Sequence, residues 1–170
     1  MTDVIFLALL FIHIGTIVLW MGASILMVSV LGPGMMKLSP TTRSEFMKII
    51  GPRFVNYVIR TATVAIVAGL VLYAYITQVS PSLAPTTSGT PWIGIGILFG
   101  LIAYAIGLAF VVRLNRKVFK LLANVPAPAA GAGGPSPELQ ALQKRIAMTS
   151  GITALFLFLA LLSMVVGANM

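Results

Sequence analysis

The chain has 170 residues, of which 59% are hydrophobic and 8% are charged, and its mean hydropathy is +1.05. Soluble domains carry charge on about a quarter of their residues, so this composition excludes an ordinary soluble domain and indicates an integral membrane protein. The net charge of +8 does not indicate a nucleic-acid partner, because the basic residues are confined to two loops. The absence of cysteine excludes disulfides and thiolate metal sites.

Four apolar stretches are each long enough to cross a bilayer, which takes about 20 helical residues. They cover roughly residues 3–30, 54–79, 91–112 and 146–168. The sequence therefore predicts an all-α integral membrane four-helix bundle that forms a single domain over residues 1–170. We expect a multi-pass protein of the cell (plasma or cytoplasmic) membrane.

The eleven basic residues are segregated by topology, since all of them fall within 37–60 and 113–145. By the positive-inside rule, both of these segments face the cytoplasm and both termini face outward (N-out/C-out). A cationic surface next to the membrane also attracts anionic lipids, which we expect as partners on the cytoplasmic side.

The first span contains His13, the only histidine of the chain, close to the middle of the bilayer. Trp20 and Met27 follow it at heptad steps and share its helix face, and Met21 lies nearby. A neutral imidazole is a good ligand for haem iron or copper, and thioethers are soft ligands for copper. The alternative is a hydrogen bond from His13 to a hydroxyl or carbonyl group of another helix.

The first cytoplasmic loop contains two predicted helix breaks. Gly32-Pro33-Gly34 is expected to end the first helix, and Ser39 then caps a short interfacial helix over Pro40–Ile50. Gly51-Pro52 is expected to end this interfacial helix before the second span begins.

Arg60 lies about two turns inside the second span. It either extends its guanidinium group back to the basic surface or acts as counter-ion to a bound propionate or phosphate.

The third span carries small residues on one stripe, with Gly96 and Gly100 in the GxxxG spacing and Ala103 and Gly107 continuing it. This stripe indicates close helix packing or space for a flat cofactor. The helix should continue into the cytoplasm as an amphipathic extension, followed by a flexible low-complexity linker over residues 124–137. Pro137 then begins the fourth helix.

The run Phe11-Ile12-His13, six residues, Trp20-Met21-Gly22 resembles the first-helix pattern His-x6-Trp-x-Gly of the copper-resistance protein D (CopD) superfamily and of HemJ-type protoporphyrinogen oxidases. Further elements that resemble CopD-type proteins are Pro33, Leu38-Ser39-Pro40, Pro52-Arg53-Phe54, Ala68-Gly69-Leu70 and Arg113-Leu114-Asn115. Resemblance to CopD implies a four-helix element associated with copper handling. Resemblance to HemJ implies a haem or porphyrin site that uses the first-helix histidine.

The leading hypothesis is a CopD-like membrane protein that binds haem b or copper through His13, as a homodimer or within a larger membrane complex. Trp20 and Arg60 would border the cofactor, and His13, Met21 and Met27 are the candidate metal ligands. We expect no enzymatic activity from the chain by itself. One alternative is a non-catalytic accessory subunit whose Gly-rich third helix packs against a larger enzyme, such as a copper-dependent monooxygenase. A second alternative is a HemJ-like protoporphyrinogen oxidase.

Overall fold

The computed structural model describes residues 3–124 and 137–170, and all regular structure within these ranges is helical. Four helical stretches are long and apolar enough to cross a membrane. They are Val4–Met35, Thr41–Gln78, Thr90–Val118 and Pro137–Asn169. The prediction of an all-α protein with four membrane-spanning helices is confirmed.

The first helix is longer than predicted. It runs through α1 (Val4–Leu26), a π-helical segment η1 (Met27–Leu31) and α2 (Gly32–Met36). The predicted break at Gly32 is therefore wrong. The Gly32 N–H donates to the Met27 carbonyl group five residues back, and a Cβ at residue 32 would lie 2.9 Å from that oxygen. Glycine thus permits the wide π turn, and Pro33, which lacks an N–H, follows it without ending the helix.

The second helix, α3 (Pro40–Gln78), begins where the sequence predicts, because the Ser39 hydroxyl accepts a hydrogen bond from the Thr42 N–H at 3.3 Å. It does not end at Gly51, and Pro52 lies inside it. The separate interfacial helix over Pro40–Ile50 is therefore a wrong prediction. A proline removes one backbone donor, and the remaining hydrogen bonds of a 39-residue helix are sufficient to keep it continuous.

The second half of the chain follows the prediction closely. A short 3₁₀ turn, η2 (Pro81–Leu83), leads to α4 (Thr90–Ile106), which continues through the π-helical η3 (Gly107–Val112) into the amphipathic α5 (Arg113–Asn124). The last helix, α6 (Pro137–Asn169), has Pro137 at its first position. The predicted flexible linker over 124–137 falls almost entirely outside the described residues.

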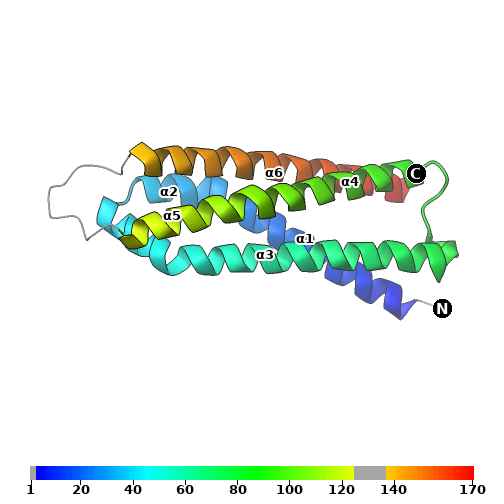
Figure 1. The fold of residues 1–170 in the computed structure, drawn as a ribbon. Helices are drawn as coiled ribbons and strands as arrows, with labels where there is room; N and C mark the ends of the chain where they lie inside the picture. The colour runs from blue at the N-terminus through cyan, green and yellow to red at the C-terminus, as the bar shows by residue number, and fades with distance from the viewer. Residues whose placement is uncertain (1–2, 125–136) are drawn as a thin grey trace.

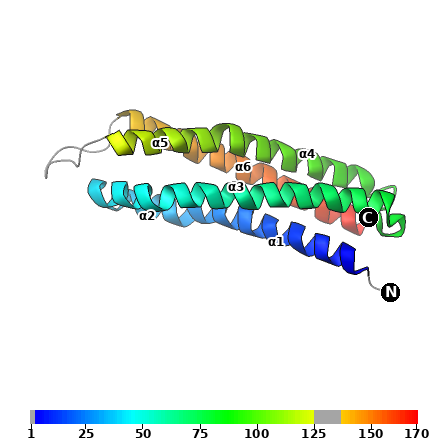
Figure 2. The ribbon, with the colours of Figure 1, turned by 60° about the horizontal axis from the view of Figure 1, so that its bottom comes forward.

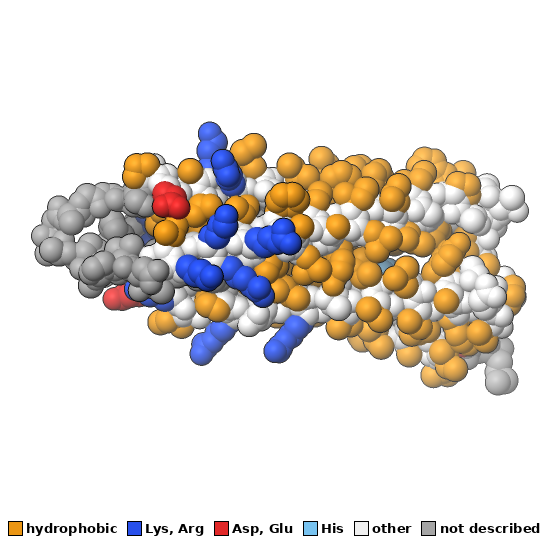
Figure 3. Space-filling model, in the orientation of Figure 1, with side chains coloured by type: hydrophobic (Ala, Val, Ile, Leu, Met, Phe, Trp, Pro, Cys, Tyr) orange, Lys and Arg blue, Asp and Glu red, His pale blue; other side chains and the backbone are white. Residues whose placement is uncertain are grey.

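The four long helices form two packed pairs, α1 with α3 and α4 with α6 (Figures 1 and 2). Both ends of the chain lie at the same end of the bundle (Figure 1). Lys and Arg side chains gather over the opposite half, whereas an apolar surface covers the half near the termini (Figure 3). Large apolar side chains such as Phe11, 79% exposed, point outward, as expected of helices solvated by lipid.

Small residues bring α4 and α6 close together. A Cβ at Gly96 would lie 2.6 Å from Met164 Cγ and 3.1 Å from the Ala160 carbonyl oxygen, and a Cβ at Gly89 would overlap the carbonyl oxygen of Gly167. The stripe predicted from the GxxxG spacing is thus used for packing inside the bundle. Gly94 of the same helix is exposed, and the accessory-subunit alternative, in which this helix packs against a larger enzyme, stays a prediction.

Candidate functional site

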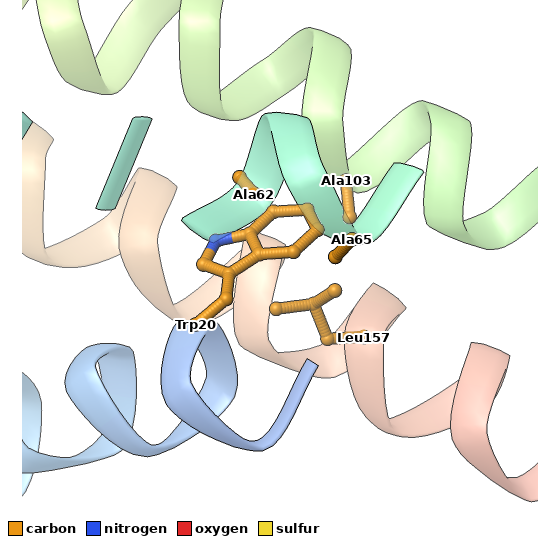
Figure 4. Close-up of a cluster of buried hydrophobic side chains, with 5 residues drawn as sticks. All are labelled: Trp20, Ala62, Ala65, Ala103 and Leu157. Atoms are coloured by element: carbon orange, nitrogen blue, oxygen red, sulfur yellow. The ribbon is translucent and has the colours of Figure 1, made fainter. Parts of the chain in front are cut away.

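Trp20 lies where all four long helices meet. Its indole ring, 3% exposed, packs against Ala62 and Ala65 of α3, Ala103 of α4 and Leu157 of α6 (Figure 4). Three alanines leave the space that the large ring fills. Trp20 therefore joins the two helix pairs, a role that its spacing from His13 in the sequence does not reveal.

Tyr104 completes this cluster. Its ring meets the ring of Trp20 edge to face, with centroids 6.4 Å apart and an interplanar angle of 85°. The Tyr104 hydroxyl shares a hydrogen bond of 2.9 Å with the Thr63 hydroxyl. This bond links α4 to α3 at the depth of Trp20.

His13 forms a hydrogen bond between α1 and α3. Its Nδ1 lies 2.8 Å from the carbonyl oxygen of Ala65, and since a carbonyl only accepts, Nδ1–H is the donor. Gly69 lies one turn beyond Ala65, and a Cβ there would be 2.5 Å from His13 Cε1. The absent side chain makes room for the imidazole. The interhelical hydrogen bond to a carbonyl, one of the two predicted roles, is confirmed.

In a neutral ring, this geometry would leave His13 Nε2 as the unprotonated nitrogen. Histidines that bind metals also donate their second N–H to a carbonyl or carboxylate group, so the bond to Ala65 is compatible with ligation. Among the described residues, however, no group of three or more His, Cys, Asp or Glu side chains could hold a metal ion.

The predicted metal ligands are not brought together. His13, Met21 and Met27 follow one continuous helical path along α1 into η1. At a rise of about 1.5 Å per residue, Met21 lies about 12 Å and Met27 about 21 Å along the axis from His13. Metal–ligand bonds are only about 2–2.5 Å long, so these three side chains of one chain do not share a metal ion.

A cavity of about 770 Å³ lies between the helix pairs on the basic side of Trp20. Trp20, Tyr104 and Thr153 line one end of it, and its walls are mainly apolar side chains of α1, α3, η3 and α6. Pockets that hold small molecules usually have about 300–1,000 Å³, so this cavity is large enough for a ligand.

The other end of the cavity is polar and cationic. Arg43 and Lys144 line it together with three amide side chains, Asn115, Gln140 and Gln143. The Arg43 Nη2 group donates to the Leu38 carbonyl oxygen at 3.4 Å. The cations come from two helices and from both basic segments, which explains why no local motif in the sequence indicates this site.

The candidate residues from the sequence divide into two groups. Trp20 and Met27 line the cavity, whereas His13, Met21 and Arg60 do not, and the Arg60 side chain is exposed. Sequence reasoning did not assign Arg43 and Lys144 to a site. Two further thioethers, those of Met35 and Met47, also line the cavity.

Both π-helical segments border the cavity. Met27 and Val28 come from η1, and Gly107, Leu108 and Val111 come from η3. A π turn widens a helix, and such segments occur often at functional sites. A Cβ at Gly107 would have no atom within 4 Å, so the space beside η3 is open.

A second polar cluster lies at the other end of the bundle. Asp3 caps α1, where its carboxylate accepts from the Phe6 N–H at 3.0 Å, and it also accepts from the hydroxyls of Tyr75 at 2.9 Å and Ser80 at 3.1 Å. The Phe6 N–H contributes most to holding the pKa of Asp3 below its ordinary value; the hydroxyls act in the same direction, and desolvation opposes them. The cluster fastens the start of α1 to the end of α3.

This cluster predicts an acid-side loss of stability. A carboxylate whose pKa is lower in the folded state stabilises the fold above its unfolded pKa, and that contribution is lost as pH falls through the folded pKa. We therefore expect the melting temperature, followed by circular dichroism, to fall below about pH 4. Asp3→Asn should abolish much of this dependence and Glu45→Gln should retain it. An unchanged acid profile in Asp3→Asn would refute the role of the cluster.

The fold and the cavity together define a class, a multi-pass membrane protein with a ligand-sized cavity at one end of its helical bundle. No family model, no curated protein and no solved structure matches this chain. The function is therefore inferred from the cavity itself.

Proposed function

We propose that this protein is a binding protein of the cell membrane that takes an amphipathic anion into the cavity beside Trp20. The observation that carries the proposal is the distribution of polarity, with mainly apolar walls and a cationic end lined by Arg43 and Lys144. Apolar burial contributes about 25 cal/mol per Å² to binding, and the cations select the anionic end of the ligand.

The proposed orientation follows from charge. Both basic segments face the cytoplasm by the positive-inside rule, so both termini face outward and the cationic end of the cavity lies on the cytoplasmic side. Along α6, the residues that line the cavity run from Gln140 to Thr153, which are about 20 Å apart at a helical rise of about 1.5 Å per residue. Along α3 they run from Arg43 to Ala62, which are about 28 Å apart. The ligand is therefore an elongated or flat molecule with one charged end.

Haem b, which the CopD and HemJ resemblance implies, meets part of this description. Its ring is apolar, and Arg43 and Lys144 would face its two propionates. No imidazole lines the cavity, since His13 lies outside it, so an iron ligand there would come from Met27, Met35 or Met47. The same thioethers are the soft groups that copper would use. His13 does not hold either cofactor inside this cavity.

The test uses Trp20 as the reporter. The chain has two tryptophans, so the Trp92→Phe background leaves Trp20 as the only indole. In nanodiscs of zwitterionic lipid, haemin and a brominated long-chain fatty acid are titrated and the Trp20 fluorescence is recorded. We expect saturable quenching by at least one probe. Gly107→Phe, which fills the cavity, should weaken binding at least tenfold, about 1.4 kcal/mol.

The matched control is Gly94→Phe. Gly94 lies on the same helix, is exposed, and has no atom within 4 Å of a Cβ position. This variant should bind like the parent. Absence of saturable quenching, or equal binding by the two phenylalanine variants, would contradict the proposal. Metal analysis and absorption spectra of the purified protein decide whether haem or copper accompanies the chain.

A further inference from the structure

The indole N–H of Trp20 has no hydrogen-bond acceptor among the described residues, although the side chain is only 3% exposed. The hydroxyls of Ser24, Tyr104 and Thr153 line the same cavity but do not accept a hydrogen bond from the indole. Tyr104 bonds to Thr63, the Thr153 hydroxyl donates to the Thr149 carbonyl at 2.9 Å, and the Ser24 hydroxyl donates to the Trp20 carbonyl at 3.0 Å. Trp20 Nε1 is not among the fully buried side-chain atoms that lack a partner, so this donor borders open space although the residue as a whole is buried. A tryptophan N–H in such a position usually binds a partner.

The nitrogen faces the cavity. In Figure 4 the six-membered part of the indole lies toward Ala65, Ala103 and Leu157, and the nitrogen lies on the side of Ala62. Ala62 lines the cavity with Trp20, whereas the other three residues do not. The donor is therefore directed into the end of the cavity that Ala62 lines, which along α3 lies opposite the end lined by Arg43.

We infer that the ligand carries an oxygen acceptor at its buried end, which accepts a hydrogen bond from Trp20 Nε1, and an anionic group at Arg43 and Lys144. The chemical class is an oxygenated long-chain anion, such as a keto acid. This inference rests on the proposed function and narrows the class of ligand. It disfavours haem b, which carries only methyl and vinyl groups at the edge opposite its propionates. The apolar walls between the two polar ends match a hydrocarbon chain.

The experiment compares keto fatty acids, with the ketone at successive positions along the chain, with the parent fatty acid. Binding to the wild-type protein in zwitterionic nanodiscs is measured by equilibrium dialysis. We expect affinity to peak at one ketone position, roughly tenfold above the parent acid. A ¹³C-labelled ketone at that position should show a carbonyl infrared band shifted to lower frequency on binding.

Trp20→Phe retains an aromatic ring and removes the donor. It should reduce the ratio of keto-acid to parent-acid affinity to about one and abolish the band shift. Trp92→Phe should change neither the ratio nor the band. If Trp20→Phe folds poorly, the ratio of keto-acid to parent-acid affinity in the wild-type protein is still a decisive measurement. Equal binding of keto and parent acids without a band shift, as expected if water satisfies the indole, overturns the inference and leaves the proposed function intact. Failure of both acids and of haemin to bind overturns the proposed function.

Discussion

Gly69→Ala is expected to lower the free energy of unfolding by about 2–4 kcal/mol. The new Cβ would lie 2.5 Å from His13 Cε1 and 2.7 Å from Nδ1, so the imidazole has to move away. That movement breaks the hydrogen bond to the Ala65 carbonyl and leaves a polar ring in an apolar environment without its partner. Equilibrium unfolding in mixed micelles, followed by circular dichroism, measures the change.

The control for this prediction is Gly15→Ala in α1, where a Cβ would have no atom within 4 Å. Because alanine favours helices, this variant should be as stable as the wild type or more stable. The decisive comparison is a double-mutant cycle. In a His13→Ala background, Gly69→Ala should cost less than about 0.5 kcal/mol, because the ring it displaces is gone. Equal losses of unfolding free energy in both backgrounds would show that Gly69 is not needed to make room for the His13 ring.

Gly96→Leu is the second large effect, with an expected loss of about 3 kcal/mol or more. Met164 can rotate away from a new side chain, but the Ala160 carbonyl oxygen, 3.1 Å from the Cβ position, is part of the backbone of α6. The substitution therefore forces α4 and α6 apart along the face that the glycines form.

Gly94→Leu is the matched control, two residues away on the same helix and facing open space. It adds the same side chain and removes the same glycine, so it should unfold within about 0.5 kcal/mol of the wild type. Similar losses in the two variants would mean that the contact between α4 and α6 is not what the glycine at position 96 provides.

The sequence was sufficient for the features that depend on residue type and spacing. Apolar length predicted the four spans, the Ser39 cap predicted the start of α3, and the GxxxG spacing predicted a packing face. The breaks at Gly32 and Pro52 were wrong because a proline removes one donor, and a π turn or a long continuous helix accommodates that loss.

The candidate site was less predictable. The acceptor for His13 is a backbone carbonyl, which has no signature in the sequence. The cavity arises where two π-helical segments and small side chains such as Ala62 and Gly107 leave space between helix pairs. Its cations, Arg43 and Lys144, are far apart in the chain and meet only in the fold. Trp20 and Met27, which the sequence singles out, do line the cavity, and their contact with a cofactor or metal stays a prediction.

The most direct test of the account is native mass spectrometry of the protein after incubation with haemin or with the keto fatty acid that the wild type prefers. We expect one bound anion per chain in the wild type and in Gly94→Phe, and a much smaller liganded fraction in Gly107→Phe. Bound mass that is the same in Gly107→Phe as in the wild type, or a wild-type chain that binds neither probe, would contradict it.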